Sequence, residues 1–155
     1  MSLKKIVSGG QTGVDRGALD AALDAGFPCG GWATHDRIAE DGRIPERYPL
    51  TELPDAGYEE RTLKNVLDSD GTAIFYFKEL EGGTRLTMEY CVAHGKPFEQ
   101  IDASRLTTKD AALGLAAFVL HNRIAVLNFA GPRASKQPTA YEYARSTVNS
   151  LLQEI

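Results

Sequence analysis

The sequence predicts a single α/β domain, a three-layer α/β/α Rossmann-like sandwich with a mostly parallel sheet. Three short apolar segments, at residues 4–7, 72–77 and 124–129, are nearly continuous rather than alternating in hydrophobicity. Strands that are buried on both faces of a parallel sheet have this pattern. Helical patterns separate the three segments, which implies crossover connections, and 155 residues suit one domain over residues 1–155.

The expected helices rest on apolar residues that recur at helical spacing. In the first of them, Val14, Ala18, Leu19 and Ala22 share one face. The predicted helices span residues 14–25, 58–67, 84–94, 109–121 and 139–153. Two weaker strands are expected near residues 28–30 and 97–101, which completes a sheet of five strands.

One segment, residues 33–57, breaks the alternation of strands and helices. It has no clean period and is interrupted by Asp41–Gly42 and by three prolines. Loops of this length inside compact domains are usually functional or disordered. Apolar anchors such as Ile38, Ile44 and Tyr48 favour an ordered, lid-like loop, and the alternative is a surface connection.

Composition and charge exclude several classes of protein. A formal charge of -4 and a pI near 5.4 argue against general nucleic-acid binding, which needs surplus Lys and Arg on one face. No apolar stretch suits a signal peptide or a membrane span, so we expect a cytoplasmic protein without a membrane partner. Cys29 and Cys91 lack metal-ligand spacing, and we expect reduced thiols and no metal site.

The strongest local motif is the glycine-rich stretch at residues 8–17, which follows the first strand and opens the first helix. Glycines allow a sharp turn and close approach of a ligand, and the start of a helix favours an anion. The spacing fits neither a Walker loop nor the dinucleotide fingerprint. Alternatively, Thr12 caps the helix in a capping box with Asp15, whose charge would repel an anion on the helix axis. The candidate contacts in this loop are Gly9, Gly10, Gln11, Thr12, Gly13 and Arg16.

Two further loops end at the same edge of the predicted sheet. The first follows residues 72–77 and opens a helix that Thr84 can cap, and the second follows the last strand. Ligands of open parallel sheets bind outside the carboxyl ends of the strands, where all three loops must meet. Basic side chains, among them Arg85 and Lys136, would surround this crevice. The candidate contacts are Gly82, Gly83, Thr84, Thr87, Asn128 and Arg133.

Other polar residues are weaker candidates for the same site. Arg61 and Asn65 share a helical face, either toward the crevice or as an ordinary polar face. Asp41 in the lid could accept hydrogen bonds from a guanine-like base or a pterin, or could belong to a solvated turn. Trp32 could stack on a heterocycle or simply pack. We identify no catalytic residue, because the histidines are scattered and none accompanies a nucleophile.

The chain resembles the family of molybdenum cofactor carrier proteins, a branch of the Rossmann-like group related to the lysine-decarboxylase-like phosphoribohydrolases. The resemblance covers nearly the whole chain. It rests on residues 8–20, 39–50 and 58–70, on Gly82–Gly83–Thr84 and Gly95–Lys96–Pro97, and on Asn128 with Gly131–Pro132–Arg133. One departure concerns residues 31–34, Gly-Trp-Ala-Thr, where family members often carry a Cys-Pro pair.

The resemblance implies a homo-oligomer that binds the molybdenum cofactor (molybdopterin) or a related phosphorylated pterin. Such a protein would hold this anionic ligand without turnover and hand it to an apo-molybdoenzyme. One alternative is a phosphoribohydrolase acting on nucleoside monophosphates, for which Glu89 is the nearest carboxylate but stands at the wrong spacing from the glycines. Another is a sensor of a nucleotide derivative. We favour a binding protein over an enzyme.

Overall fold

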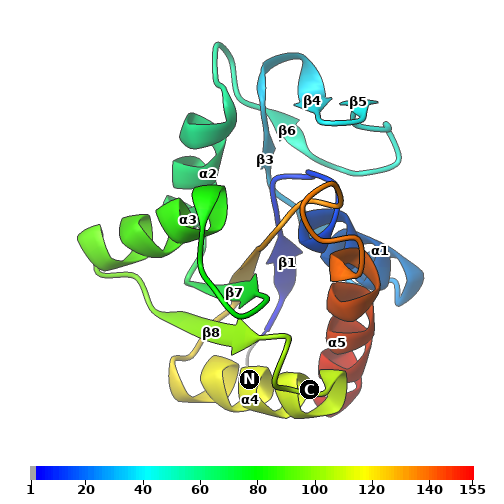
Figure 1. Cartoon of the computed structure of the whole chain (residues 1–155), viewed down its shortest axis with the longest axis vertical. Coiled ribbons are helices and arrows are strands. Elements are labelled where there is room, and N and C mark those ends of the chain that lie inside the picture. The colour runs from blue at the N-terminus through cyan, green and yellow to red at the C-terminus, as the bar shows by residue number, and fades with distance from the viewer. Residues whose placement is uncertain (1–2) are drawn as a thin grey trace.

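The computed structural model describes residues 3–155 and has a five-stranded parallel sheet at its centre (Figure 1). The strand order is β2-β1-β9-β7-β8, and every neighbouring pair is parallel. The strands are β1 (Lys5–Val7), β2 (Cys29–Gly30), β7 (Gly71–Tyr76), β8 (Phe98–Asp102) and β9 (Val126–Ala130). All five predicted strands are confirmed, with ends shifted by one or two residues.

Helices cover both faces of this sheet, which confirms the three-layer α/β/α fold. On one face α1 packs against α5 and α5 against α4, and on the other α2 packs against α3 (Figure 1). Their bounds are α1 (Val14–Asp24), α2 (Tyr58–Leu67), α3 (Gly82–Ala93), α4 (Thr108–His121) and α5 (Ala140–Glu154). Within residues 3–155, no helix is both long enough and apolar enough to cross a membrane.

The main core lies between the sheet and the α1, α4 and α5 layer. Phe75 of β7 and Phe129 of β9 are almost fully buried there, with ring centroids 6.0 Å apart. Residues 71–75 are all buried, because helices cover both faces of the central strand β7. This double burial explains why the strand segments are continuously apolar in sequence.

Neither the Thr12 cap, the alternative interpretation of the first loop, nor the Thr84 cap is formed. The N-cap of α1 is Gly13, at φ 83°, and no side chain caps this helix. Thr12 instead donates its hydroxyl to the Glu40 carboxylate. Helix α3 begins two residues early, at Gly82 with Glu81 as its N-cap, so Thr84 lies inside the first turn. Gly13 can adopt this positive φ because it has no side chain. The Thr12 hydroxyl is used instead in a tertiary contact with Glu40.

The segment 33–57 has little regular structure. It contains the end of β3 (Trp32–Ala33), the 3-10 turn His35–Arg37, and strands β4 (Ile38–Ala39), β5 (Gly42–Arg43) and β6 (Thr51–Glu52). The buried Arg37 guanidinium donates to four backbone carbonyls, those of Ile44, Pro45, Tyr48 and Leu50. One buried cation thus replaces the hydrogen bonds that a helix or sheet would supply.

Candidate functional site

A pocket of about 440 Å³ opens at the carboxyl ends of β7 and β9. Helices α2 and α3 form one wall, and the loops after β1 and β9 form the other. The pocket lies where the sequence places the meeting point of the three loops. Ten predicted contacts line it: Gly9, Gln11, Arg61, Asn65, Gly82, Gly83, Thr84, Thr87, Asn128 and Arg133.

The start of α3 offers unused hydrogen-bond donors to this pocket. The first N–H groups of a helix have no acceptor within the helix, and within residues 3–155 those of Gly82, Gly83 and Thr84 have none elsewhere. The Thr84 side chain is 8% exposed and likewise has no protein partner in this part of the chain. Lys136 Nζ lies 3.8 Å from where a Cβ on Gly82 would stand. This end of the pocket therefore favours an anion.

Arg61 brings a buried positive charge into the same pocket. The residue is 8% exposed, its Nη1 donates to the Gly9 carbonyl at 3.0 Å, and its guanidinium lies 5.4 Å from the Tyr58 ring centroid. Among residues 3–155, no carboxylate approaches it within 4.0 Å, and Nε and Nη2 make no hydrogen bond. The Asp15 carboxylate attracts this guanidinium from beyond ion-pair distance, and a ligand anion in the pocket would add the direct partner that stabilises a buried charge.

Asp15 is the buried carboxylate of the pocket, and its oxygens are turned toward the first glycine-rich loop. Its Oδ2 accepts the Gln11 N–H at 3.1 Å, and the Gly9 N–H also contributes to its stabilisation. Burial raises the pKa of Asp15 to about 6, against the opposing effect of Arg61. A carboxylate of the protein therefore occupies backbone donors that the sequence assigned to a ligand anion.

The Asp15 carboxyl should make stability depend on pH. Its folded-state pKa of about 6 lies above the ordinary 3.8, so the folded chain holds this proton more tightly than the unfolded chain. The contribution of Asp15 to stability is therefore fully present below about pH 4 and is lost as pH rises through 6. From about pH 4.5 to about pH 7.5, we expect wild type to lose about 2 kcal/mol relative to Asp15→Asn.

Urea unfolding of both proteins across this range measures that difference. Subtracting the Asp15→Asn curve removes the titration of all other groups, including Glu40 and Asp41. A difference that stays constant with pH would show that Asp15 has an ordinary pKa in the folded chain.

The rest of the first loop is also occupied by internal contacts. Gln11 Oε1 accepts the N–H groups of Thr12 at 3.0 Å and Glu40 at 2.9 Å. A Cβ on Gly13 would meet the Pro132 carbonyl oxygen at 2.3 Å, and one on Gly10 would meet Leu50. These glycines permit close packing of the loop against residues 132–134 and the segment 33–57. Gly10, Thr12 and Gly13 do not line the pocket.

Two carboxylates hold the segment 33–57 closed against the loops. Asp41 makes a bidentate pair with Arg16 at 2.6 and 2.8 Å, and this pairing lowers the pKa of Asp41. Glu40 accepts from Ser135 and Thr12, which lowers the pKa of Glu40, and lies 3.4 Å from Arg133 Nε. Arg16 and Asp41 therefore stand outside the pocket lining, and no residue of the segment 33–57 lines it.

The two predicted asparagines line the pocket but are partly engaged elsewhere. Asn65 accepts the Trp32 N–H at 2.9 Å and donates to the Trp32 carbonyl at 3.0 Å. Asn128 donates to Thr72 Oγ1 at 3.2 Å. The Thr87 hydroxyl donates to the Gly83 carbonyl at 2.9 Å, inside α3. These three residues therefore shape the pocket as well as line it.

Sequence reasoning missed several residues of the lining. Tyr58 opens α2, Tyr76 ends β7, and Phe77 follows directly. The aromatic residues at the carboxyl end of the buried strand could have been predicted to line the pocket, because ligands of open parallel sheets bind at this edge. Asp15, which the sequence places at the start of the first helix, also lines the pocket, and its burial is not visible from its sequence neighbours.

A family model described as the circularly permutated YpsA SLOG family matches residues 6–152 of this chain. The chain belongs to this family. A crystal structure from Syntrophus aciditrophicus SB, of a protein named "Putative molybdenum carrier protein", is 45% identical with a TM-score of 0.95. The match covers 97% of this chain and 96% of that one. Both matches confirm the resemblance drawn from the sequence motifs, and no curated protein matches the chain.

Two residues that the sequence singled out lie outside the pocket lining of this circularly permutated YpsA SLOG protein. Glu89 pairs with Arg85 at 3.5 Å, and both side chains are more than half exposed. Trp32 is fixed by its indole N–H, which donates to Asp68 at 2.8 Å, and by Lys64, 5.2 Å from its ring. Trp32 lines a second cavity of about 270 Å³ instead.

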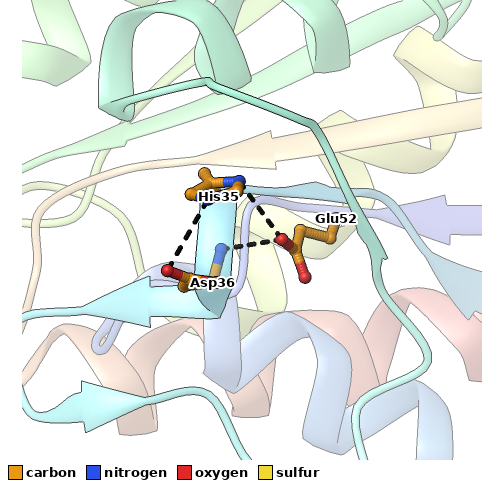
Figure 2. A group of neighbouring side chains, drawn as sticks. All are labelled: His35, Asp36 and Glu52. Atoms are coloured by element: carbon orange, nitrogen blue, oxygen red, sulfur yellow. Dashed lines mark hydrogen bonds and ion pairs between the residues drawn. The ribbon is translucent and has the colours of Figure 1, made fainter.

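His35, Asp36 and Glu52 form a surface cluster that spacing did not predict, because Glu52 is distant in sequence (Figure 2). Asp36 lies 3.6 Å from His35 Nε2, whereas Glu52 lies 3.4 Å from His35 Nδ1. The carboxylates of Asp36 and Glu52 thus lie beside different nitrogens of the His35 ring. Glu52 also accepts a hydrogen bond from the Asp36 N–H at 2.9 Å. Asp36 has a φ of 61°, in the left-handed region. The cluster stabilises a left-handed turn.

Proposed function

We propose that this protein binds and protects a phosphorylated pterin, the molybdenum cofactor, as a carrier without turnover. The observation that carries the proposal is the buried Arg61, which forms no ion pair within 4.0 Å among residues 3–155. It lines one pocket with the N–H groups at the start of α3, which make no hydrogen bond in the same part of the chain. A pocket of about 440 Å³ suits a ligand of mononucleotide size. The name of the Syntrophus aciditrophicus protein supports molybdenum cofactor as that ligand.

The anion would bind at the start of α3 rather than in the first glycine-rich loop. The Gln11 N–H already donates to the Asp15 carboxylate, and the Thr12 N–H donates to the Gln11 side-chain oxygen. At the start of α3, by contrast, Gly82, Gly83 and Thr84 combine with Lys136 to offer several donors. The proposed contacts are therefore Arg61, Gly82, Gly83, Thr84, Lys136 and Arg133, with Gln11 and Asn128 beside them.

The pocket does not favour the hydrolase alternative that rests on Glu89, because Glu89 lies outside the lining. With Glu89 outside the pocket, Gly82 and Gly83 are assigned a binding role. A sensor would use the same binding contacts, so transfer of the bound cofactor to an apo-molybdoenzyme separates carrier from sensor.

Gly83→Asp tests the anion site directly. A Cβ at Gly83 meets nothing within 4 Å, so the substitution should fold while placing a carboxylate at the start of α3. We expect affinity for molybdenum cofactor to fall at least about 30-fold, since a like charge at this position costs about 2 kcal/mol. Gly83→Asn is the matched neutral control and should stay within about threefold of wild type.

Anaerobic calorimetric titration with molybdenum cofactor, AMP and GMP measures this binding, with each mixture assayed for released base. Saturable cofactor binding without base release supports the carrier. Base release from a nucleotide would favour the hydrolase, and absence of cofactor binding would exclude the carrier. Equal loss in both Gly83 variants would mean that size, not charge, excludes the ligand.

A further inference from the structure

The loop of residues 131–137, between β9 and α5, carries two of the positive charges that line the pocket. Both Arg133 and Lys136 belong to the lining, and Lys136 lies beside the start of α3. The N–H groups of Lys136 and Gln137 donate to the Arg133 carbonyl at 3.1 Å each. These internal hydrogen bonds shape a turn, but they do not fix where the turn lies. Contacts with distant segments must therefore set its place against the pocket.

Thr12 holds the middle of this loop with a single hydroxyl group. Its Oγ1 accepts the Ala134 N–H at 3.1 Å and donates its own proton to the Glu40 carboxylate. A hydroxyl can make both bonds at once, because it has one donor and two acceptor lone pairs. Thr12 belongs to the glycine-rich motif, yet it does not line the pocket. It touches instead the loop that brings cations to the pocket.

Glu40 holds the same loop from the segment 33–57. Its Oε1 accepts the Ser135 hydroxyl at 2.5 Å, and its Oε2 accepts the Ser135 N–H at 3.1 Å. Its Oε1 also lies 3.4 Å from Arg133 Nε. The Glu40 N–H in turn donates to Gln11 Oε1 at 2.9 Å. Because hydrogen bonds to a carboxylate are strong, this one residue ties together three segments that are distant in sequence.

We propose that Thr12 and Glu40 are positioning residues, which hold the loop 131–137 so that Lys136 and Arg133 meet the bound anion. The inference rests on the proposed function and assigns part of its affinity to residues outside the pocket lining. A loop that is fixed before binding loses less conformational entropy when the ligand binds. Without the two anchors, the cost of ordering this loop would be subtracted from the affinity.

Thr12→Val tests the anchors without changing any charge. Valine keeps the shape of the side chain but can neither accept from Ala134 nor donate to Glu40. We expect about 10-fold weaker affinity for molybdenum cofactor in anaerobic calorimetry, whereas Thr12→Ser keeps the hydroxyl and should stay within about threefold of wild type. Thr34→Val is the matched control. The Thr34 hydroxyl also donates and accepts, to the carbonyl and from the N–H of Ile38, but Thr34 does not line the pocket.

A double variant shows whether Thr12 acts through the loop. Lys136→Met alone should weaken binding about 10-fold. If Thr12 places Lys136, the two changes together should weaken binding by less than about 30-fold, well short of the roughly 100-fold that independent effects give. All affinities are measured under conditions where urea unfolding shows each variant to be folded. A threonine that only stabilises the fold would then leave the affinity unchanged.

Three results would overturn the inference while leaving the carrier proposal standing. The first is a Thr12→Val protein that binds the cofactor as tightly as wild type. The second is an equal loss of affinity in Thr34→Val, and the third is a double variant whose two effects multiply in full. Wild type that binds no cofactor would overturn the proposed function and this inference together.

Discussion

Gly31→Ala is expected to destabilise this protein strongly. Gly31 lies between β2 and β3 at φ 127°, a conformation that side chains rarely adopt. A Cβ there would stand 2.1 Å from the Ser8 carbonyl oxygen and 2.9 Å from the Ser8 nitrogen, both backbone atoms. Ser8 N donates to Gly30 O at 3.1 Å, so relief of the clash must part β2 from β1. We expect a loss of about 4–5 kcal/mol.

Gly26→Ala is the control for this effect. Gly26 also has a positive φ, of 65°, but nothing lies within 4 Å of its Cβ position. Its substitution should therefore cost only about 1 kcal/mol, from backbone strain alone. Urea unfolding midpoints of the two variants and wild type measure both costs. Similar losses in the two variants would mean that strain, not the approach of Ser8, makes glycine necessary at position 31.

Arg61→Met is expected to give the largest loss of ligand binding. The side chain is buried, and its guanidinium has a single protein hydrogen bond, to the Gly9 carbonyl. Methionine keeps much of the apolar stem but removes the charge and the free donors. Removing one partner of a buried charge pair costs about 3–4 kcal/mol, which corresponds to a 100- to 1,000-fold weaker affinity for molybdenum cofactor.

Two further variants separate charge from geometry at position 61. Arg61→Lys keeps the positive charge without the planar fork and should recover part of the affinity. Arg85→Met removes an exposed arginine of α3 that pairs with Glu89 and does not line the pocket, so its affinity should match that of wild type. An Arg61→Met protein that is folded and still binds the cofactor normally would remove Arg61 from the site.

The sequence determined the α/β class, all five helices and the five strands of the sheet. Residues 72–77 and 124–129 are continuously apolar because both faces of those strands are covered. Each residue of such a strand must be apolar whatever its neighbours, so the pattern is visible in the sequence. The place of the pocket could also be predicted, since parallel strands bring the loops after β1, β7 and β9 to one edge of the sheet. Ten predicted contacts consequently line one pocket.

Only the tertiary structure decided how each loop is used. In sequence, residues 8–17 and Gly82–Gly83–Thr84 are both glycine-rich starts of helices. In the fold, Asp15 and Gln11 satisfy donors of the first loop, whereas the start of α3 keeps its donors free. Likewise Arg37 and Arg61 are both buried arginines. Arg37 donates to four backbone carbonyls, whereas Arg61 lines the pocket. Local sequence sets which groups can donate or accept, but their partners come from distant segments, and only packing brings those together.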